Sequence, residues 1–82
     1  MNNDLLLELL EAIQERPNKH APLYNDGRAL DANTVKHLQA LIDHGMVEGT
    51  VKTSGIDGSN YRTKINGVTA QGLEYLEKLR EN

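Results

Sequence analysis

The stretch that decides the fold is residues 31–79, DANTVKHLQALIDHGMVEGTVKTSGIDGSNYRTKINGVTAQGLEYLEKL. It begins with a helix that Asp31 caps and that runs to about His44, because apolar residues recur there at three- and four-residue spacing. Gly45 ends this helix, since glycine readily adopts the left-handed backbone that is common at helix ends. The apolar residues expected to face the core are Val35, Leu38, Leu41 and Ile42.

Two segments of alternating character, 47–53 and 61–65, follow this helix. Their odd-numbered positions are apolar or small and their even-numbered positions are polar, which predicts two strands with one buried face. Residues 54–60 between them are rich in Gly, Ser and Asn and predict a hairpin with a long tip. Alternate side chains of a strand point to the same face, so the basic residues of the hairpin are expected together on its outer face. They are Lys52, Arg62 and Lys64.

Two further helices complete the predicted domain. The first runs from Asn3, its expected N-cap, to about Arg16, because Pro17 prevents continuation. The last begins after Thr69, which is a good N-cap. The first helix is expected to bury Leu6, Leu9, Leu10 and Ile13, and the last helix to bury Leu73, Leu76 and Leu79 with Tyr75 beside them.

Residues 17–30 interrupt the helical pattern. Pro22 and the turn sequence Asn25-Asp26-Gly27 favour an extended or irregular segment with room for a single helical turn. The whole chain of 82 residues is therefore expected to form one α+β domain.

Charge is unevenly distributed along the chain, whose net charge is −3. Residues 32–67 hold a local excess of one positive charge, whereas both flanking parts are acidic. DNA-binding domains usually carry a basic patch, and here the excess of basic over acidic residues is small and confined to the second helix and the hairpin. The absence of cysteine excludes disulfides and thiolate metal sites. Glu8 and Glu11 break the apolar run near the start, so neither a signal peptide nor a membrane span is expected, and the expected setting is cytoplasmic.

Two segments resemble winged-helix proteins. The segment Val35–Gly49 looks like the helix that leads into the wing, in which Gly45 and two apolar residues open the first wing strand. Tyr61 together with Ile65–Leu76, including Thr69-Ala-Gln-Gly72, looks like the element that joins the wing to the last helix. The chain is most similar to small, uncharacterised winged-helix proteins of bacteria and prophages, and more distantly to MarR- and PadR-type regulators. The resemblance implies a three-helix core with a two-stranded β-hairpin wing, and residues 17–30 stand where the first helix of a helix-turn-helix is degenerate.

This resemblance also implies a function, that of a small phage or bacterial transcriptional regulator that binds double-stranded DNA. A helix in the major groove needs short polar and basic side chains near its N-terminal half, and a wing needs cations for the phosphate backbone. The alternative for each surface is an ordinary solvated face. A homodimer is expected through Leu5, Leu7 or the helix over 69–80. The expected DNA-binding residues are Asn33, Lys36, His37, Lys52, Arg62 and Lys64.

A second hypothesis is a protein-binding module on the same scaffold, such as a phage-encoded modulator or inhibitor of a host enzyme or defence complex. It rests on an acidic ridge of the first helix that could dock on a basic surface: Asp4, Glu8, Glu11 and Glu15. No enzyme is expected, because Ser54 and Ser59 lie in the hairpin tip without a nearby base. No cofactor or metal is expected either, since His37 and His44 are two helical turns apart.

Overall fold

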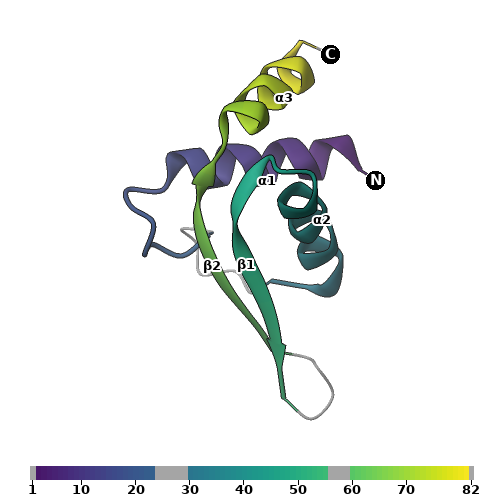
Figure 1. Cartoon of the computed structure of the whole chain (residues 1–82). Coiled ribbons are helices and arrows are strands. Elements are labelled where there is room, and N and C mark those ends of the chain that lie inside the picture. Colours follow the sequence, from purple (N-terminus) through teal and green to yellow (C-terminus); the bar gives the residue numbers. More distant parts are fainter. Residues whose placement is uncertain (1, 24–29, 56–59, 82) are drawn as a thin grey trace.

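The computed structural model describes residues 2–23, 30–55 and 60–81, and within these ranges the chain forms three helices and one two-stranded antiparallel sheet. The α+β class is therefore as expected. The elements in chain order are α1 (Asn3–Glu15), α2 (Ala32–Asp43), β1 (Val47–Ser54), β2 (Asn60–Val68) and α3 (Ala70–Arg80). Figure 1 shows the hairpin extending away from the helices, with α2 beside β1 and with α3 at the opposite end of the molecule from the end of the hairpin.

The segment between α1 and α2 is described only in part. Residues 17–23 form no helix or strand, in agreement with the irregular conformation expected there. They contain a turn in which the backbone N–H of Ala21 donates to the carbonyl of Asn18 at 3.2 Å. The turn expected at 25–27 and the centre of the hairpin tip, 56–59, lie outside the described residues.

The N-cap of α1 is one residue earlier than expected. The side chain of Asn2, not that of Asn3, accepts from the backbone N–H groups of Asp4 at 2.9 Å and Leu5 at 3.3 Å. At the other end, Arg16 has an extended backbone, as its position before a proline requires. The expected stripe of this helix is buried: Leu6, Leu9, Leu10 and Ile13.

Helix α2 has the caps that its sequence predicts. The Asp31 carboxylate accepts from the backbone N–H of Thr34 at 2.7 Å. Gly45 has a φ of +73°, and the backbone N–H groups of Gly45 and Met46 donate to carbonyls of the last helical turn at 3.0 and 2.9 Å. These two bonds form a Schellman motif, which ends the helix and leads the chain directly into β1.

The buried face of α2 is rotated relative to the expected stripe. Leu38 and Leu41 are buried as expected, but Thr34 and His37 are buried as well. The other two expected residues are only half-buried: Val35 and Ile42. The rotation arises because α2 packs against both α1 and β1, so its most buried side is decided by two neighbours at once.

Strands β1 and β2 form the expected hairpin, although they pair over longer segments than expected. The register shifts between Glu48 and Gly49, where Asn66 has no Cα partner and forms a β-bulge. A bulge bends its strand, and β2 continues past it from the buried Ile65 to Val68, next to the start of α3.

The junction between β2 and α3 is held by Thr69. Its hydroxyl donates to the carbonyl of Gly45 at 2.7 Å and accepts from the backbone N–H of Gly72 at 3.0 Å. Its own backbone N–H donates to the carbonyl of Met46 at 3.0 Å. Thr69 therefore caps α3, as expected, and also ties this helix to the junction between α2 and β1.

The inward residues of α3 differ from the expected set at one position. Leu76 is buried, and Leu79 and Tyr75 pack against the core. Leu73 was expected inside, but it is 40% exposed. The helix meets the rest of the protein on the side of the buried Gly72, which turns Leu73 to the margin of the contact.

The core lies where α1, α2 and α3 meet the inner face of the hairpin. Leu9 and Leu10 of α1 and Leu38 of α2 are completely buried. These side chains supply much of the apolar burial on which a domain of this size depends. The remaining buried hydrophobic residues are Leu6, Ile13, Leu41, Val47, Ile65 and Leu76.

We expect Asp31 to make the stability of the protein sensitive to acid. Hydrogen bonds from Thr34, first its backbone N–H and then its hydroxyl, hold the pKa of the Asp31 carboxyl below its ordinary value. Such a group stabilises the folded state above the unfolded pKa of about 3.9, and this contribution is lost as the pH falls through the lower folded pKa.

The variant Asp31→Asn keeps a capping oxygen but does not titrate. Its urea midpoint should therefore fall less than that of the wild type when the pH is lowered from about 5 to about 2. An equal fall in both proteins would contradict the assigned role of Asp31.

Candidate nucleic-acid interface

The outer face of the hairpin carries three exposed basic side chains, which we call the hairpin cations: Lys52, Arg62 and Lys64. Lys52 of β1 pairs directly with Arg62 of β2, and Lys64, two residues farther along β2, pairs with Thr50. Paired residues share a face of the sheet, as do residues two apart on one strand. The structure therefore groups the three hairpin residues that the sequence predicted to lie together.

The pairing of Lys52 with Arg62 is electrostatically unfavourable. Like charges directly opposite each other on neighbouring strands destabilise a hairpin by roughly 0.2–1 kcal/mol. In the described register, no carboxylate is paired with any of the three hairpin cations. An anion bound over this face would offset the repulsion.

A fourth basic residue, Lys19, lies beside the hairpin, although the sequence did not predict it there. It is exposed in the turn that follows α1. This turn and the bulge of β2 border the same hollow of about 200 Å³, whose lining includes Lys19, Asn66 and Gly67. No local sequence signal places Lys19 there, because Pro17 predicts the end of α1 but not the direction of the chain that follows.

Arg16 holds this turn against the sheet. Its guanidinium donates to the carbonyl of Ile65 at 2.9 Å and to the carbonyl of Lys19 at 3.4 Å, and its Nε donates to the carbonyl of Ile13 at 3.5 Å. Partial burial lowers the pKa of the Arg16 guanidinium from its usual value. Arginine nevertheless stays charged in proteins, so these bonds are charge-assisted.

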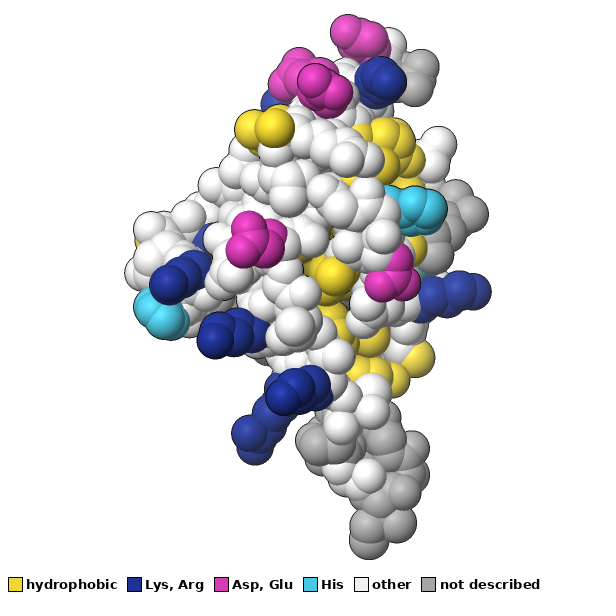
Figure 2. Space-filling view, in the orientation of Figure 1, with side chains coloured by type: hydrophobic (Ala, Val, Ile, Leu, Met, Phe, Trp, Pro, Cys, Tyr) yellow, Lys and Arg dark blue, Asp and Glu magenta, His cyan; other side chains and the backbone are white. Residues whose placement is uncertain are grey.

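Figure 2 shows the result on the surface: Lys and Arg side chains run in a row along one edge of the molecule, over the hairpin and the turn beside it. Glu48 is the acidic residue on this face of β1, and its carboxylate accepts from the side-chain amide of Asn66 at 3.3 Å. The row therefore consists of basic side chains, and the carboxylate of Glu48 lies beside it.

Two of the three expected contact residues on α2 are on its exposed face, and the third is not. Asn33 and Lys36 are exposed, as expected. Helix α2 lies beside β1 and away from β2 (Figure 1), so these two residues lie apart from the basic residues of β2.

His37 was expected on the exposed face of α2, and this expectation is wrong. It is only 4% exposed. Its Nε2 accepts from the backbone N–H of Asn2 at 3.1 Å, which leaves Nδ1 to donate to the carbonyl of Asn33 at 2.7 Å. His37 thus joins the start of α1 to α2 from within the structure, and its side chain is not part of the exposed candidate interface.

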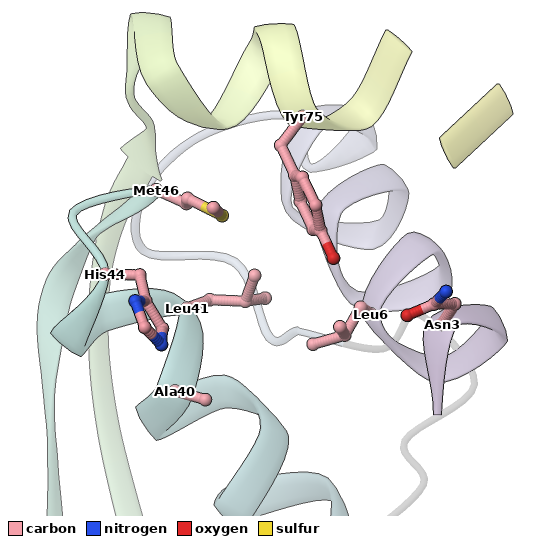
Figure 3. Close-up of a pocket in the computed structure, with 7 residues that line it drawn as sticks. All are labelled: Asn3, Leu6, Ala40, Leu41, His44, Met46 and Tyr75. Carbon is pink, nitrogen blue, oxygen red and sulfur yellow. The ribbon is translucent and has the colours of Figure 1, made fainter. Parts of the chain in front are cut away.

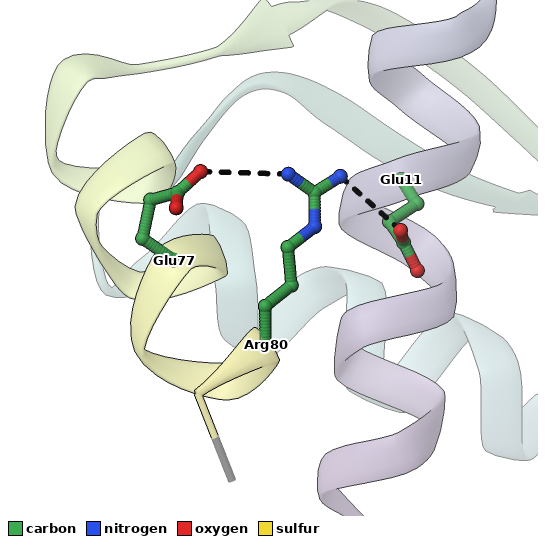
Figure 4. Close-up of polar contacts among 3 residues, drawn as sticks. All are labelled: Glu11, Glu77 and Arg80. Atoms are coloured by element: carbon green, nitrogen blue, oxygen red, sulfur yellow. Dashed lines mark hydrogen bonds and ion pairs between the residues drawn. The ribbon is translucent and has the colours of Figure 1, made fainter.

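The acidic ridge of α1 is interrupted by α3. Glu11 accepts from the Arg80 guanidinium at 3.2 Å, and the same guanidinium contacts Glu77 at 3.4 Å (Figure 4). The Glu11 side chain nevertheless remains 38% exposed in this ion pair. Asp4 and Glu15 are exposed, whereas Glu8 and Glu11 are half-buried, so the ridge is more exposed at its two ends than in the middle.

A larger hollow of about 320 Å³ lies between the three helices (Figure 3). Tyr75 of α3 reaches across toward Leu6 of α1, and His44 lies at the end of α2 on the other side. The remaining lining residues are Asn3, Ala40, Leu41 and Met46. The lining therefore combines apolar side chains with one imidazole, of His44, and one phenol, of Tyr75, and it includes no carboxylate.

Within the described ranges, no three His, Asp or Glu side chains come together as metal ligands. None of the helices in this part of the chain combines the length and the apolar character that a membrane crossing needs. Comparisons with protein-family models, with curated proteins and with solved structures found no match for this chain.

Proposed function

We propose that this protein binds double-stranded DNA, with the hairpin as the wing of a winged helix and the hairpin cations on the phosphate backbone. One observation carries the proposal: Lys52 and Arg62 face each other across the two strands, with Lys64 beside them on the same exposed face. A regular row of exposed cations suits a regular row of phosphates, because phosphate contacts dominate the affinity of proteins for DNA.

The order of elements supports the winged-helix part of the proposal. Helix α2 leads through the Schellman motif at Gly45 into the hairpin, and Thr69 returns the chain to a last helix. In this proposal α2 takes the place of the recognition helix, with Asn33 and Lys36 exposed near its N-terminal half. Within the described part of the segment before α2, residues 17–23 form no helix.

A regulator of transcription is the biological role that this proposal favours. A few phosphate contacts give weak, salt-sensitive binding, and a homodimer would double their number. Leu73 on α3 is an exposed apolar residue that could contribute to such a contact, and Leu5 and Leu7 of α1 are half-buried. The protein-binding alternative has less support, because Glu11 in the middle of the acidic ridge already pairs with Arg80 of α3.

The test is a salt titration of DNA binding with the hairpin cations removed. The triple variant Lys52→Gln, Arg62→Gln, Lys64→Gln should bind DNA with a weaker salt dependence. The negative slope of log affinity against log salt should become less steep by about 2.7, or about 0.9 for each lost phosphate contact. Fluorescence anisotropy with a random-sequence duplex, between about 50 and about 200 mM salt, measures this slope.

Two controls make the result specific. Lys78→Gln removes one positive charge from α3, away from the hairpin, and should leave the slope unchanged. Urea denaturation of the triple variant should show no loss of stability, since the substitutions relieve the repulsion between Lys52 and Arg62. A triple variant with the slope and affinity of the wild type would refute the proposed function.

A further inference from the structure

We propose that the DNA-binding surface extends beyond the hairpin to Lys19, so that the backbone of one DNA strand runs along the outer face of β2 to the turn after α1. This inference rests on the proposed function and adds to it a path and a direction for the bound strand. It also assigns a contact residue outside both the hairpin and α2.

The placement of Lys19 follows from the hydrogen bonds of Arg16. One guanidinium binds the carbonyl of Lys19 and the carbonyl of Ile65, at 3.4 and 2.9 Å. Ile65 directly follows Lys64 on β2, so the main chain of Lys19 is held next to the main chain that carries Lys64. The shared hollow, with Lys19 on one side and Asn66 on the other, gives the same placement independently.

Arg16 acts in this arrangement as a positioning residue. Its guanidinium donates hydrogen bonds to three carbonyl groups, those of Ile13, Lys19 and Ile65. It is half-buried, whereas Lys19 is exposed. Lys19 is therefore the residue that can reach a phosphate, and Arg16 keeps it in line with the hairpin cations.

The row has the spacing of an extended strand. Arg62 and Lys64 are two residues apart, or about 7 Å along β2. Each strand of duplex DNA carries a phosphate for about every 3.4 Å of the helix axis. A row with the Lys52–Arg62 pair at one end, Lys64 next and Lys19 beyond it therefore faces several phosphates of one strand, which fits a polyanion better than a single phosphate group.

Glu48 is expected to weaken DNA binding at this surface, whereas the basic residues strengthen it. It lies on the outer face of β1, two residues from Thr50, which pairs with Lys64. Its carboxylate bonds the Asn66 amide beside the same hollow that Lys19 borders. A phosphate backbone on the proposed path passes this carboxylate and is repelled by it.

The test combines Lys19→Gln and Glu48→Gln in the anisotropy titration with the random-sequence duplex. Lys19→Gln should lower the salt slope by about 0.9, the contribution of one phosphate contact. Glu48→Gln keeps an acceptor for Asn66 and should raise the affinity. The matched controls Lys78→Gln and Glu74→Gln, both on α3, should leave the slope and the affinity unchanged.

A variant of Arg16 tests its positioning role. In an Arg16→Met background, Lys19→Gln should have little further effect on the salt slope. Methionine cannot hold the turn against β2, so Lys19 no longer lies on the path of the bound DNA strand. Circular dichroism would show whether that background folds, and the single Lys19 variant remains decisive if it does not.

The outcomes separate this inference from the proposed function. A wild-type slope for Lys19→Gln, together with a reduced slope for the hairpin triple variant, would overturn the extension and leave the proposed function standing. Unchanged slopes in both would overturn both. A reduced slope for Lys19→Gln with unchanged controls supports the path along β2.

Discussion

Replacing Gly72 by alanine is expected to lower the free energy of unfolding by about 3 kcal/mol or more. A Cβ atom at this position would overlap the carbonyl oxygen of Met46 and would lie 2.6 Å from Cγ1 of Val68. The Met46 carbonyl is not free to move, because it accepts from the backbone N–H of Thr69 at 3.0 Å. Relief of the overlap therefore requires α3 to shift away from the junction between α2 and β1.

Helix propensity alone predicts the opposite sign for this substitution. Alanine is more favourable than glycine within a helix by about 1 kcal/mol. Close packing outweighs this gain, because the atoms overlapped include backbone and not merely the end of a flexible side chain. A domain of 82 residues has a total stability of roughly 4–12 kcal/mol, so the expected loss is a large part of it.

The matched control for Gly72→Ala is Gly67→Ala. A Cβ at Gly67 of β2 would have no heavy atom within 4 Å. Urea denaturation should therefore give Gly67→Ala a midpoint close to that of the wild type, and Gly72→Ala a much lower midpoint or no folded baseline. If the two variants were equally stable, the close approach of α3 to Met46 would not be what requires glycine.

Replacing His37 by alanine is expected to lower the free energy of unfolding by about 2–4 kcal/mol. The substitution opens a cavity in a nearly closed site and removes both ring hydrogen bonds, one to the backbone of Asn2 and one to that of Asn33. The bond to Asn2 also links the start of α1 to α2, so its loss should loosen that end of α1.

The exposed neighbour of His37 supplies the control. Lys36→Ala removes a side chain of similar length from the same helix and should change the stability by less than about 0.5 kcal/mol. Thermal or urea unfolding distinguishes the two variants. If His37→Ala kept wild-type stability but lost DNA affinity, His37 would be a contact residue after all, and its assignment to the interior would be wrong.

The ends of the helices and the faces of the hairpin were largely predictable from the sequence. The caps at Asp31, Gly45 and Thr69 involve groups within a few residues, or backbone conformations that the residue type itself favours. The period of two along a strand placed Lys52, Arg62 and Lys64 on one face without knowledge of the packing. The prediction at Asn3 missed by a single residue because Asn2 is an equally good capping residue.

The sequence by itself determined which segments are helix or strand and which hairpin residues share a face, because these depend on interactions between near neighbours in the chain. Only the tertiary structure decided that His37 is buried, that Leu73 is exposed and that Lys19 joins the basic row. These outcomes depend on contacts between distant residues, such as Asn2 with His37 and Arg16 with Ile65, which are 35 and 49 positions apart. No local pattern encodes such contacts, because they follow from the angle and distance at which whole elements pack.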